Sequence, residues 1–215
     1  VGRAQLRADR ERLLELLLAQ QLAQLAVPLL ERLELMAQRV ALLGELAFLA
    51  LLALIALQVR RKMGAPVLFR QTRPGLHGIP FQMLKFRTML DVRDADGTLL
   101  PDSERLTAFG RWLRATSLDE LPQFWNILRG EMSVVGPRPI VEQEIPRYGP
   151  AMEQVLSVRP GLTGLWQVSG RNNVSYQRRV LLDLTYVNRR SLGLDLRILW
   201  RTVSVVLFPA NKGAY

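Results

Sequence analysis

The first 58 residues are built from an unusually narrow set of amino acids. They include 20 Leu and 11 Ala, and no Ser, Thr, Asn, Lys, Trp, Tyr or His occurs before Lys62. Leu, Ala, Glu, Gln and Arg all favour the helix at nearly every position. We therefore expect residues 1–64 to form a helical arm. Because proline removes a backbone donor, the arm should divide into two helices near Pro28.

Charged residues interrupt the apolar positions of this arm at short intervals. The longest uncharged apolar run, Leu46–Leu57, has 12 residues, whereas a spanning helix needs about 18 or more. Such a run is typical of a core helix or of a segment that enters one leaflet without crossing it. The cations of Arg60–Lys62 follow it, as at an anionic membrane surface. The narrow alphabet is typical both of an engineered helix and of a G- and C-rich bacterial genome, and both origins stay open.

Charge and cysteine usage restrict the chemistry of the chain. With 29 Lys and Arg against 19 Asp and Glu, the net charge is +10, which favours polyanionic partners such as nucleic acid, anionic lipid or phosphate-bearing small molecules. The chain has no Cys and a single His, His77, which excludes disulfides, Fe–S clusters and multi-histidine metal sites. Carboxylates, guanidinium groups, hydroxyls and backbone must therefore carry any catalysis.

The remaining residues, 65–215, have a mixed composition and form the expected second domain. Two alternating segments, 66–71 and 81–88, predict strands of a hairpin, since Arg73–Gly78 between them supplies turn residues. Residues 91–102 are expected to form a polar loop. The sequence thus predicts an α+β fold, mostly helical with a small antiparallel hairpin, and apolar periodicity predicts helices over residues 106–114, 123–128, 142–157, 175–188 and 194–208.

Adjacent carboxylates, Asp119 and Glu120, precede Pro122 where one helix should end and another begin. One interpretation is a capping box between Ser117 and Glu120, three residues apart. The other is functional. A helix N-terminus would keep Asp119 ionised and attract phosphate, and an aspartate beside Mg²⁺ is a competent nucleophile toward phosphorus. Glu120 would help to hold that ion.

Several basic residues are placed on stiff backbone segments around this pair. Prolines on both sides of Arg138 restrict its backbone, which favours a phosphate clamp, and alternation along a strand would place Lys85 and Arg87 on one face. Arg171 lies in a Gly-Arg-Asn-Asn turn. Each segment also has an ordinary structural explanation: a solvated arginine, a half-buried strand, or a chain reversal.

Residues 159–201 carry eight Arg against Asp183 and Asp195. The two helices expected here have the character of basic amphipathic helices on an anionic bilayer, although a solvated charged face is the commoner explanation. A bilayer, a second copy of the chain in a homodimer, or the arm's own hairpin would cover the apolar arm. A basic nucleic-acid-binding protein and a non-catalytic membrane-surface scaffold stay open as alternatives to an enzyme.

Five ordered motifs from residue 65 onward resemble the bacterial sugar transferase family, the monotopic phosphoglycosyl transferases. They are KFRTM (85–89), SLDELPQ (117–123), GEMSVVGPRP (130–139), VRPGLTGLWQVSGRNN (158–173) and the terminal GAY. The resemblance implies transfer of a hexose 1-phosphate from a UDP-hexose to undecaprenyl phosphate, with release of UMP, at the cytoplasmic face of the bacterial inner membrane. It gives no role to nucleic acid.

The resemblance also implies roles for individual residues. Asp119 would be the nucleophile that forms a phosphosugar–enzyme intermediate, and Glu120 would be associated with Mg²⁺. The family's phosphate-binding residues correspond to Lys85, Arg114, Arg138 and Arg171. RPIVEQEIPRYG, GRNNVSY and GAY are most similar to the hexose-1-phosphate branch, often specific for galactose or glucose.

The arm departs from the family pattern. Family members have a re-entrant membrane helix broken at a Ser-Pro pair, and Leu49-Ala50 stands at the corresponding position here. Nothing in this segment forces a break. A straight helix, a replaced anchor and a solubilised redesign are all compatible with the sequence.

Overall fold

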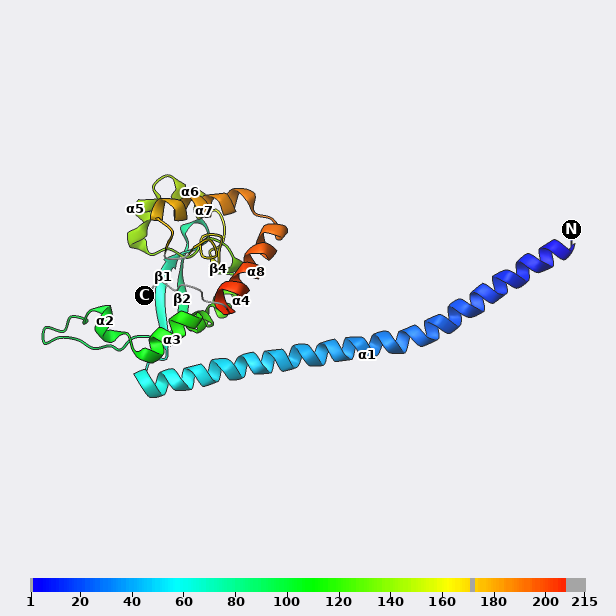
Figure 1. Cartoon of the computed structure of the whole chain (residues 1–215), viewed down its shortest axis with the longest axis horizontal. Coiled ribbons are helices and arrows are strands. Elements are labelled where there is room, and N and C mark those ends of the chain that lie inside the picture. The colour runs from blue at the N-terminus through cyan, green and yellow to red at the C-terminus, as the bar shows by residue number, and fades with distance from the viewer. Residues whose placement is uncertain (1, 171–172, 208–215) are drawn as a thin grey trace. The chain divides into compact units, whose positions relative to one another are not determined.

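The structure is a computed structural model that describes residues 2–170 and 173–207 (Figure 1). In residues 3–31 and 207 it describes the backbone alone. The chain divides into two compact units, Val1–Ala53 and Leu54–Tyr215. The expected α+β class is confirmed, since several helices accompany a small antiparallel hairpin.

One long helix, α1, runs from Gly2 to Met63. The expected break near Pro28 is wrong, because strong helix formers on both sides continue the helix through a single missing backbone donor. The helix also continues through Leu49-Ala50. Its part from Arg32 to Met63 is long and apolar enough to cross a membrane by length and composition once a few charges are tolerated. Core helices of soluble proteins and signal sequences meet the same criterion.

The last turns of α1 belong to the second unit and bury one face. Ile55, Val59 and Met63 are buried, and their spacing of four residues places them on one side of the helix. The Thr107 hydroxyl donates to the Met63 sulfur at 3.7 Å, and the Lys62 ammonium lies 5.7 Å from the centre of the Phe109 ring. These contacts attach the end of α1 to the residues that follow the polar loop.

The predicted hairpin is confirmed, with shifted boundaries. Strand β1 (Leu68–Pro74) pairs antiparallel with β2 (Pro80–Phe86), in a register that places Arg73 opposite Phe81. A short 3₁₀ turn, Leu76–Gly78, joins them. The sequence assigned Arg73 to the turn, but it lies within β1. On the core side, Phe81 and Met83 pack with Met132 and Ile127.

The polar loop after β2 leads into the helices that carry the acidic pair. A bridge between Arg93 and Leu99 closes the loop. It is followed by α2 (Asp102–Arg105), α3 (Ala108–Thr116), a 3₁₀ turn (Leu118–Glu120) and α4 (Gln123–Leu128). The helix expected from residue 106 begins at Ala108, because the Thr107 side chain accepts a hydrogen bond from the Gly110 amide and caps it.

A second, parallel pair of short strands was not predicted. Strand β3 (Ser133–Val135) pairs with β4 (Gly161–Thr163). The pairing depends on close backbone contact between Gly136 and Gly161, because a Cβ on either residue would overlap the other segment's backbone. The residues after β3 therefore lie directly against β4.

The helix expected over 142–157 is divided into three pieces. They are a 3₁₀ turn (Glu142–Glu144), α5 (Ile145–Tyr148) and α6 (Ala151–Val155). Gly149 at φ 50° and the following proline interrupt the helical pattern. Tyr148, Met152 and Val155 nevertheless share one buried cluster, so the apolar periodicity was informative although the helix was not continuous.

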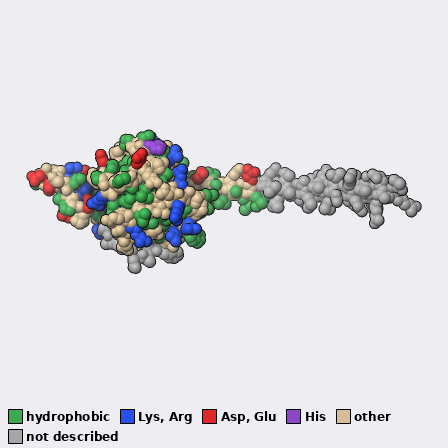
Figure 2. All heavy atoms as spheres, turned by 90° about the horizontal axis from the view of Figure 1, so that it is seen from above, with side chains coloured by type: hydrophobic (Ala, Val, Ile, Leu, Met, Phe, Trp, Pro, Cys, Tyr) green, Lys and Arg blue, Asp and Glu red, His purple; other side chains and the backbone are tan. Residues whose placement is uncertain are grey.

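The last two helices agree with expectation: α7 (Tyr176–Arg189) and α8 (Leu192–Leu207). Ile198 of α8 packs with Tyr186 of α7 and Val135 of β3. The other side of α8 leaves Trp200 and its apolar neighbours exposed. Figure 2 shows several Lys and Arg side chains on the face of this unit that it presents. The exposed apolar residues of α8 are Leu192, Leu196, Trp200, Val203 and Val206.

Candidate active site

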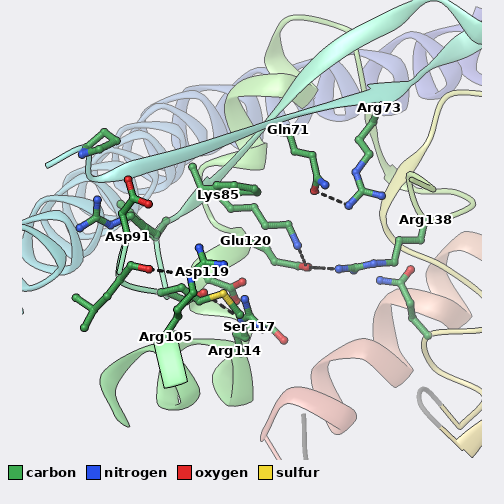
Figure 3. Close-up of a pocket in the computed structure, with 18 of the residues that line it drawn as sticks. Gln71, Arg73, Lys85, Asp91, Arg105, Arg114, Ser117, Asp119, Glu120 and Arg138 are labelled. Carbon is green, nitrogen blue, oxygen red and sulfur yellow. Dashed lines mark hydrogen bonds and ion pairs between the residues drawn. The ribbon is translucent and has the colours of Figure 1, made fainter. Parts of the chain in front are cut away.

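The acidic pair lies at a cavity of about 560 Å³ within the second unit (Figure 3). Its walls come from β1, the end of β2, α3, the 3₁₀ turn after α3, and the segments after β3 and β4. Six cationic side chains line it against three carboxylates, so the cavity is suited to a multiply charged anion. The cations are Arg73, Lys85, Arg87, Arg105, Arg114 and Arg138, and the carboxylates are Asp91, Asp119 and Glu120.

Ser117 does not form the capping box that was one interpretation of this segment. It adopts a left-handed conformation, with φ 59°, at the end of α3, and its side chain makes no cap hydrogen bond to the following turn. Glu120 instead turns into the cavity. The chain reversal at Ser117 therefore presents both adjacent carboxylates to the cavity.

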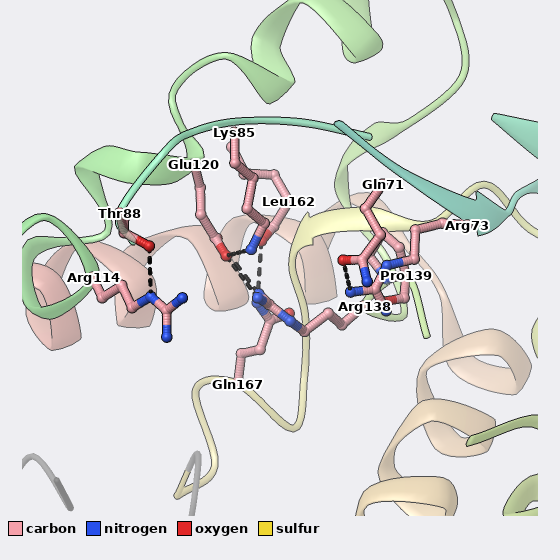
Figure 4. Close-up of polar contacts among 10 residues, drawn as sticks. All are labelled: Gln71, Arg73, Lys85, Thr88, Arg114, Glu120, Arg138, Pro139, Leu162 and Gln167. Carbon is pink, nitrogen blue, oxygen red and sulfur yellow. Dashed lines mark hydrogen bonds and ion pairs between the residues drawn. The ribbon is translucent and has the colours of Figure 1, made fainter. Parts of the chain in front are cut away.

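Glu120 is held by two cations from different parts of the fold. Lys85 Nζ, from β2, lies 2.7 Å from Glu120 Oε1, and Arg138 Nη2 lies 2.6 Å from the same oxygen (Figure 4). Burial alone would raise the pKa of Glu120, but Arg138 and Lys85 outweigh it and lower the pKa to about 2. Burial and Arg138 also lower the pKa of Lys85. Glu120 is thus an ionised carboxylate that fixes two cations.

Asp119 is buried, with 6 % of its surface exposed. Burial and the negative charge of Glu120 raise its pKa, whereas Lys85, Arg138 and Arg114 act in the opposite direction. A helix N-terminus was expected to keep this carboxylate ionised. Asp119 instead lies in the 3₁₀ turn, and these three cations are what favour its charged form. An anionic substrate would meet Asp119 within that cationic field.

Arg114 is oriented by a contact between α3 and the strand end. Its Nε donates to Thr88 Oγ1 at 3.0 Å, and Thr88 is buried. The close approach requires a glycine at position 110, because a Cβ there would overlap the Thr88 carbonyl oxygen. The outer guanidinium nitrogens of Arg114 extend beyond the contact (Figure 4).

The structure brings together most of the basic residues proposed from the sequence. Lys85, Arg87, Arg114 and Arg138 all line the cavity with the acidic pair. Arg87 also donates to the Ala65 carbonyl at 2.8 Å. Arg171 lies outside the described residues.

Sequence reasoning missed further cavity residues, notably Gln71 and Arg73 of β1. Both face the cavity with Phe69, as alternate residues of a strand do. The alternation was visible in the sequence, but the strand was expected to end at Gln71. The other missed polar lining residues are Thr88, Asp91, Arg105, Trp166 and Gln167.

The donor set allows one kind of metal site. Among the residues whose side chains the structure describes (2, 32–170 and 173–206), no group of three or more His, Cys, Asp or Glu is placed to hold a metal ion. A Mg²⁺ ion commonly needs only one or two carboxylates, because substrate phosphate oxygens and water complete its coordination. The Asp119 carboxylate suits such a shared ion, whereas Glu120 would have to share its charge between the ion and the two cations that already bind it, Lys85 and Arg138.

Known proteins match the chain over most of its length. A family model described as bacterial sugar transferase matches residues 32–209. An uncharacterized sugar transferase of Bacillus subtilis is 51% identical over 149 residues, which are 69% of this chain and 74% of that protein. The UDP-glucose:undecaprenyl-phosphate glucose-1-phosphate transferase of Caulobacter vibrioides is 43% identical over 178 residues, 76% of this chain and 65% of that protein.

A third relative is much longer than the matched region. The undecaprenyl-phosphate galactose phosphotransferase of Salmonella typhimurium is 43% identical over 171 residues, which are 71% of this chain but only 35% of that protein.

Proposed function

The chain belongs to the bacterial sugar transferase family, and on that premise we propose that it transfers a hexose 1-phosphate from a UDP-hexose to undecaprenyl phosphate, releasing UMP. The observation that carries the proposal is the buried Asp119 beside Glu120 in a cavity lined by six cations. The relatives named for glucose 1-phosphate and galactose transfer to the same lipid support the substrate class. The product would begin assembly of a polysaccharide on the lipid.

The proposed reaction has two displacements at the same phosphorus. Asp119 attacks the sugar-linked phosphorus of the UDP-hexose, so that an Asp119 Oδ–P bond forms. The bond from that phosphorus to the bridging oxygen breaks, and UMP leaves with this oxygen. A phosphate oxygen of undecaprenyl phosphate then attacks the same phosphorus and breaks the Asp119 Oδ–P bond. The carboxylate is regenerated and the product is a lipid-linked sugar diphosphate.

The cavity residues supply positioning and charge in these steps. Arg114 and Arg138 project from rigid mounts toward the space where the diphosphate would lie, and Lys85 lies beside the acidic pair. Phosphoryl transfer depends mainly on such positioning and charge neutralisation. Asp119 and Glu120 would also hold Mg²⁺, which when bound neutralises charge on the phosphate oxygens.

We place the enzyme at the cytoplasmic face of the bacterial inner membrane, where its lipid substrate is accessible. The apolar helix between Arg32 and Met63 and the exposed apolar side of α8 support membrane contact. Trp200 on α8 has Arg197 and Arg201 as close neighbours in sequence, a combination that suits an anionic headgroup region.

The test is turnover by the detergent-solubilised full chain with UDP-galactose or UDP-glucose, undecaprenyl phosphate and Mg²⁺. UMP should form, should stop forming with EDTA and should return with added Mg²⁺. With labelled UDP-hexose and no lipid, label should stay on the protein and be released by hydroxylamine, which cleaves acyl phosphates.

Asp119→Asn should abolish both UMP release and labelling, whereas Asp96→Asn in the exposed loop should retain both. Normal labelling of Asp119→Asn would refute the nucleophile. No UMP from the unmodified chain with either sugar, together with salt-sensitive nucleic-acid binding or vesicle binding alone, would favour one of the non-enzymatic alternatives.

A further inference from the structure

The turn Gly136–Pro139 carries Arg138 but has little regular hydrogen bonding of its own. Its two prolines have no N–H to donate, and the turn lies beyond the end of β3. Two backbone hydrogen bonds attach its first half to the β4 side. The Gly136 amide donates to the Thr163 carbonyl at 2.9 Å, and the Gly161 amide donates to the Pro137 carbonyl at 2.8 Å.

The second half of the turn is attached by a side chain from the hairpin. Arg73 Nη1 donates to the Pro139 carbonyl at 3.2 Å, across 66 residues of sequence. Pro139 is buried and immediately follows Arg138. Arg73 therefore fixes the carbonyl of Pro139, the residue next to Arg138, which binds Glu120.

Arg73 is itself oriented by its neighbour on the same face of β1. Its Nη2 donates to Gln71 Oε1 at 2.7 Å, and both side chains face the cavity (Figures 3 and 4). Because a planar guanidinium binds two acceptors in fixed directions, these two hydrogen bonds define where it lies. Arg73 lies near another cation, Arg138, and the two charges repel. Glu144 and Glu120 attract the same guanidinium, and the two hydrogen bonds set the direction in which it points.

We infer that Arg73, oriented by Gln71, is a positioning residue that holds the Arg138 turn so that Arg138 reaches Glu120. The inference rests on the proposed function for its catalytic consequence. Burial and Arg138 lower the pKa of Arg73 to about 10, so the side chain is still a cation near neutral pH. Its effect on catalysis passes through Arg138.

A positioning role and a direct charge role predict different kinetics. If Arg73 acts through Arg138, Arg73→Ala should lower kcat about 10-fold or more and change the KM for UDP-hexose less than about 3-fold. Arg73→Lys should not restore the rate, because an ammonium group lacks the fork that binds both acceptors. The matched control is Arg70→Ala, which removes the same charge from an exposed position of the same strand and should keep the normal rate.

A double-mutant cycle separates the two roles further. In an Arg138→Ala background, adding Arg73→Ala should lower kcat less than about 3-fold, because the residue through which Arg73 acts is already gone. The inference would be overturned if Arg73→Lys restored the normal kcat, or if Arg73→Ala changed mainly the KM. It would also be overturned if the kcat of the double variant fell by the product of the two single-variant losses.

Hydrogen exchange supplies a measurement that does not depend on turnover. The Arg138 and Ile140 amides, followed in the peptide covering residues 134–141, should exchange faster in Arg73→Ala than in Arg70→Ala. Equal exchange would overturn the positioning role. If the unmodified chain releases no UMP, the proposed function fails, while this comparison still decides whether Arg73 holds the turn.

Discussion

Glu120 Oε1 accepts from Lys85 at 2.7 Å and from Arg138 at 2.6 Å, so a single carboxylate oxygen joins β2 to the turn after β3. The Glu120 and Lys85 side chains are only 14% and 16% exposed. Removal of one partner of a partly buried ion pair costs more than the loss of a surface pair, because it leaves a desolvated charge. Glu120 therefore stabilises the walls of the cavity as well as shaping its charge.

Glu120→Gln should lower the free energy of unfolding by about 2–4 kcal/mol, because Lys85 and Arg138 would lose their shared anion. Denaturant titration in detergent measures the change. Asp102→Asn is the matched control, since the Asp102 side chain is 76% exposed in its pair with Arg105 and should change stability by less than about 0.5 kcal/mol. Equal small losses for both variants would mean that the Glu120 pairs stabilise no more than a surface ion pair.

Asp183, a buried carboxyl far from the acidic pair in sequence, should make the stability of the protein depend on pH. Burial raises the pKa of Asp183 to about 7 although Tyr148 and Arg179 oppose this, and Glu144 raises it further. Tyr148 donates to Asp183 Oδ2 at 2.9 Å. Between about pH 4 and pH 7 the folded state then holds a proton that the unfolded state has released. Stability falls as pH rises through this window, by roughly 4 kcal/mol in total.

Asp183→Asn should remove that part of the pH dependence, because the amide does not titrate and its oxygen still accepts from Tyr148. Unfolding free energies of both proteins at pH 5, 6, 7 and 8 give the comparison. The difference between variant and unmodified chain should grow in favour of the variant up to about pH 7 and then stay constant. A difference that does not vary with pH would show that Asp183 titrates normally.

Local patterns predicted those parts of the fold that local interactions determine. The alternation in 66–71 and 81–88 predicted the hairpin, and α4 begins after Pro122 with the expected bounds, Gln123–Leu128. The parallel pair β3–β4 was missed because each strand has only three residues and the pairing depends on glycines far apart in sequence, Gly136 and Gly161. A three-residue strand leaves no periodicity to detect.

Those residues of the candidate site that lie in short, distinctive motifs could be predicted from the sequence. Asp119 and Glu120 are adjacent, and the motifs containing Lys85 and Arg138 are short and distinctive. The contribution of Arg73 was not predictable, because its partner carbonyl at Pro139 lies 66 residues away and its local sequence is also typical of a turn. Pairings across such distances follow from tertiary packing, which a local pattern does not report.

Asn126 joins α4 to the edge of β2 and should be important for stability. It accepts from the Leu84 amide at 3.0 Å and donates to the Gln82 carbonyl at 2.8 Å and to Glu131 at 2.7 Å. Asn126→Ala would leave the partly buried Leu84 amide and Gln82 carbonyl without this partner and should lower the unfolding free energy by about 2 kcal/mol. Thermal unfolding measures the loss. Asn188→Ala removes an exposed amide that pairs with Gln154 and should lower the unfolding free energy by less than about 1 kcal/mol. A loss of that size for Asn126→Ala would contradict the bracing role.

Gly110 should tolerate no side chain, because α3 passes directly over the carbonyl oxygen of Thr88. A Cβ at this position would overlap that oxygen, and backbone atoms cannot move aside as a flexible side chain does. Gly110→Ala should therefore push α3 from the strand end, lower the unfolding free energy by about 2 kcal/mol or more, and lengthen the hydrogen bond from Arg114 to Thr88. Gly193→Ala is the control, since no atom lies within 4 Å of its added Cβ and alanine favours the helix.

Because Arg114 loses its anchor, Gly110→Ala should also slow UMP release more than its loss of folded protein explains. Rate per folded molecule, with the folded fraction taken from circular dichroism, decides this. An unchanged rate would show that Arg114 reaches the substrate without help from Thr88.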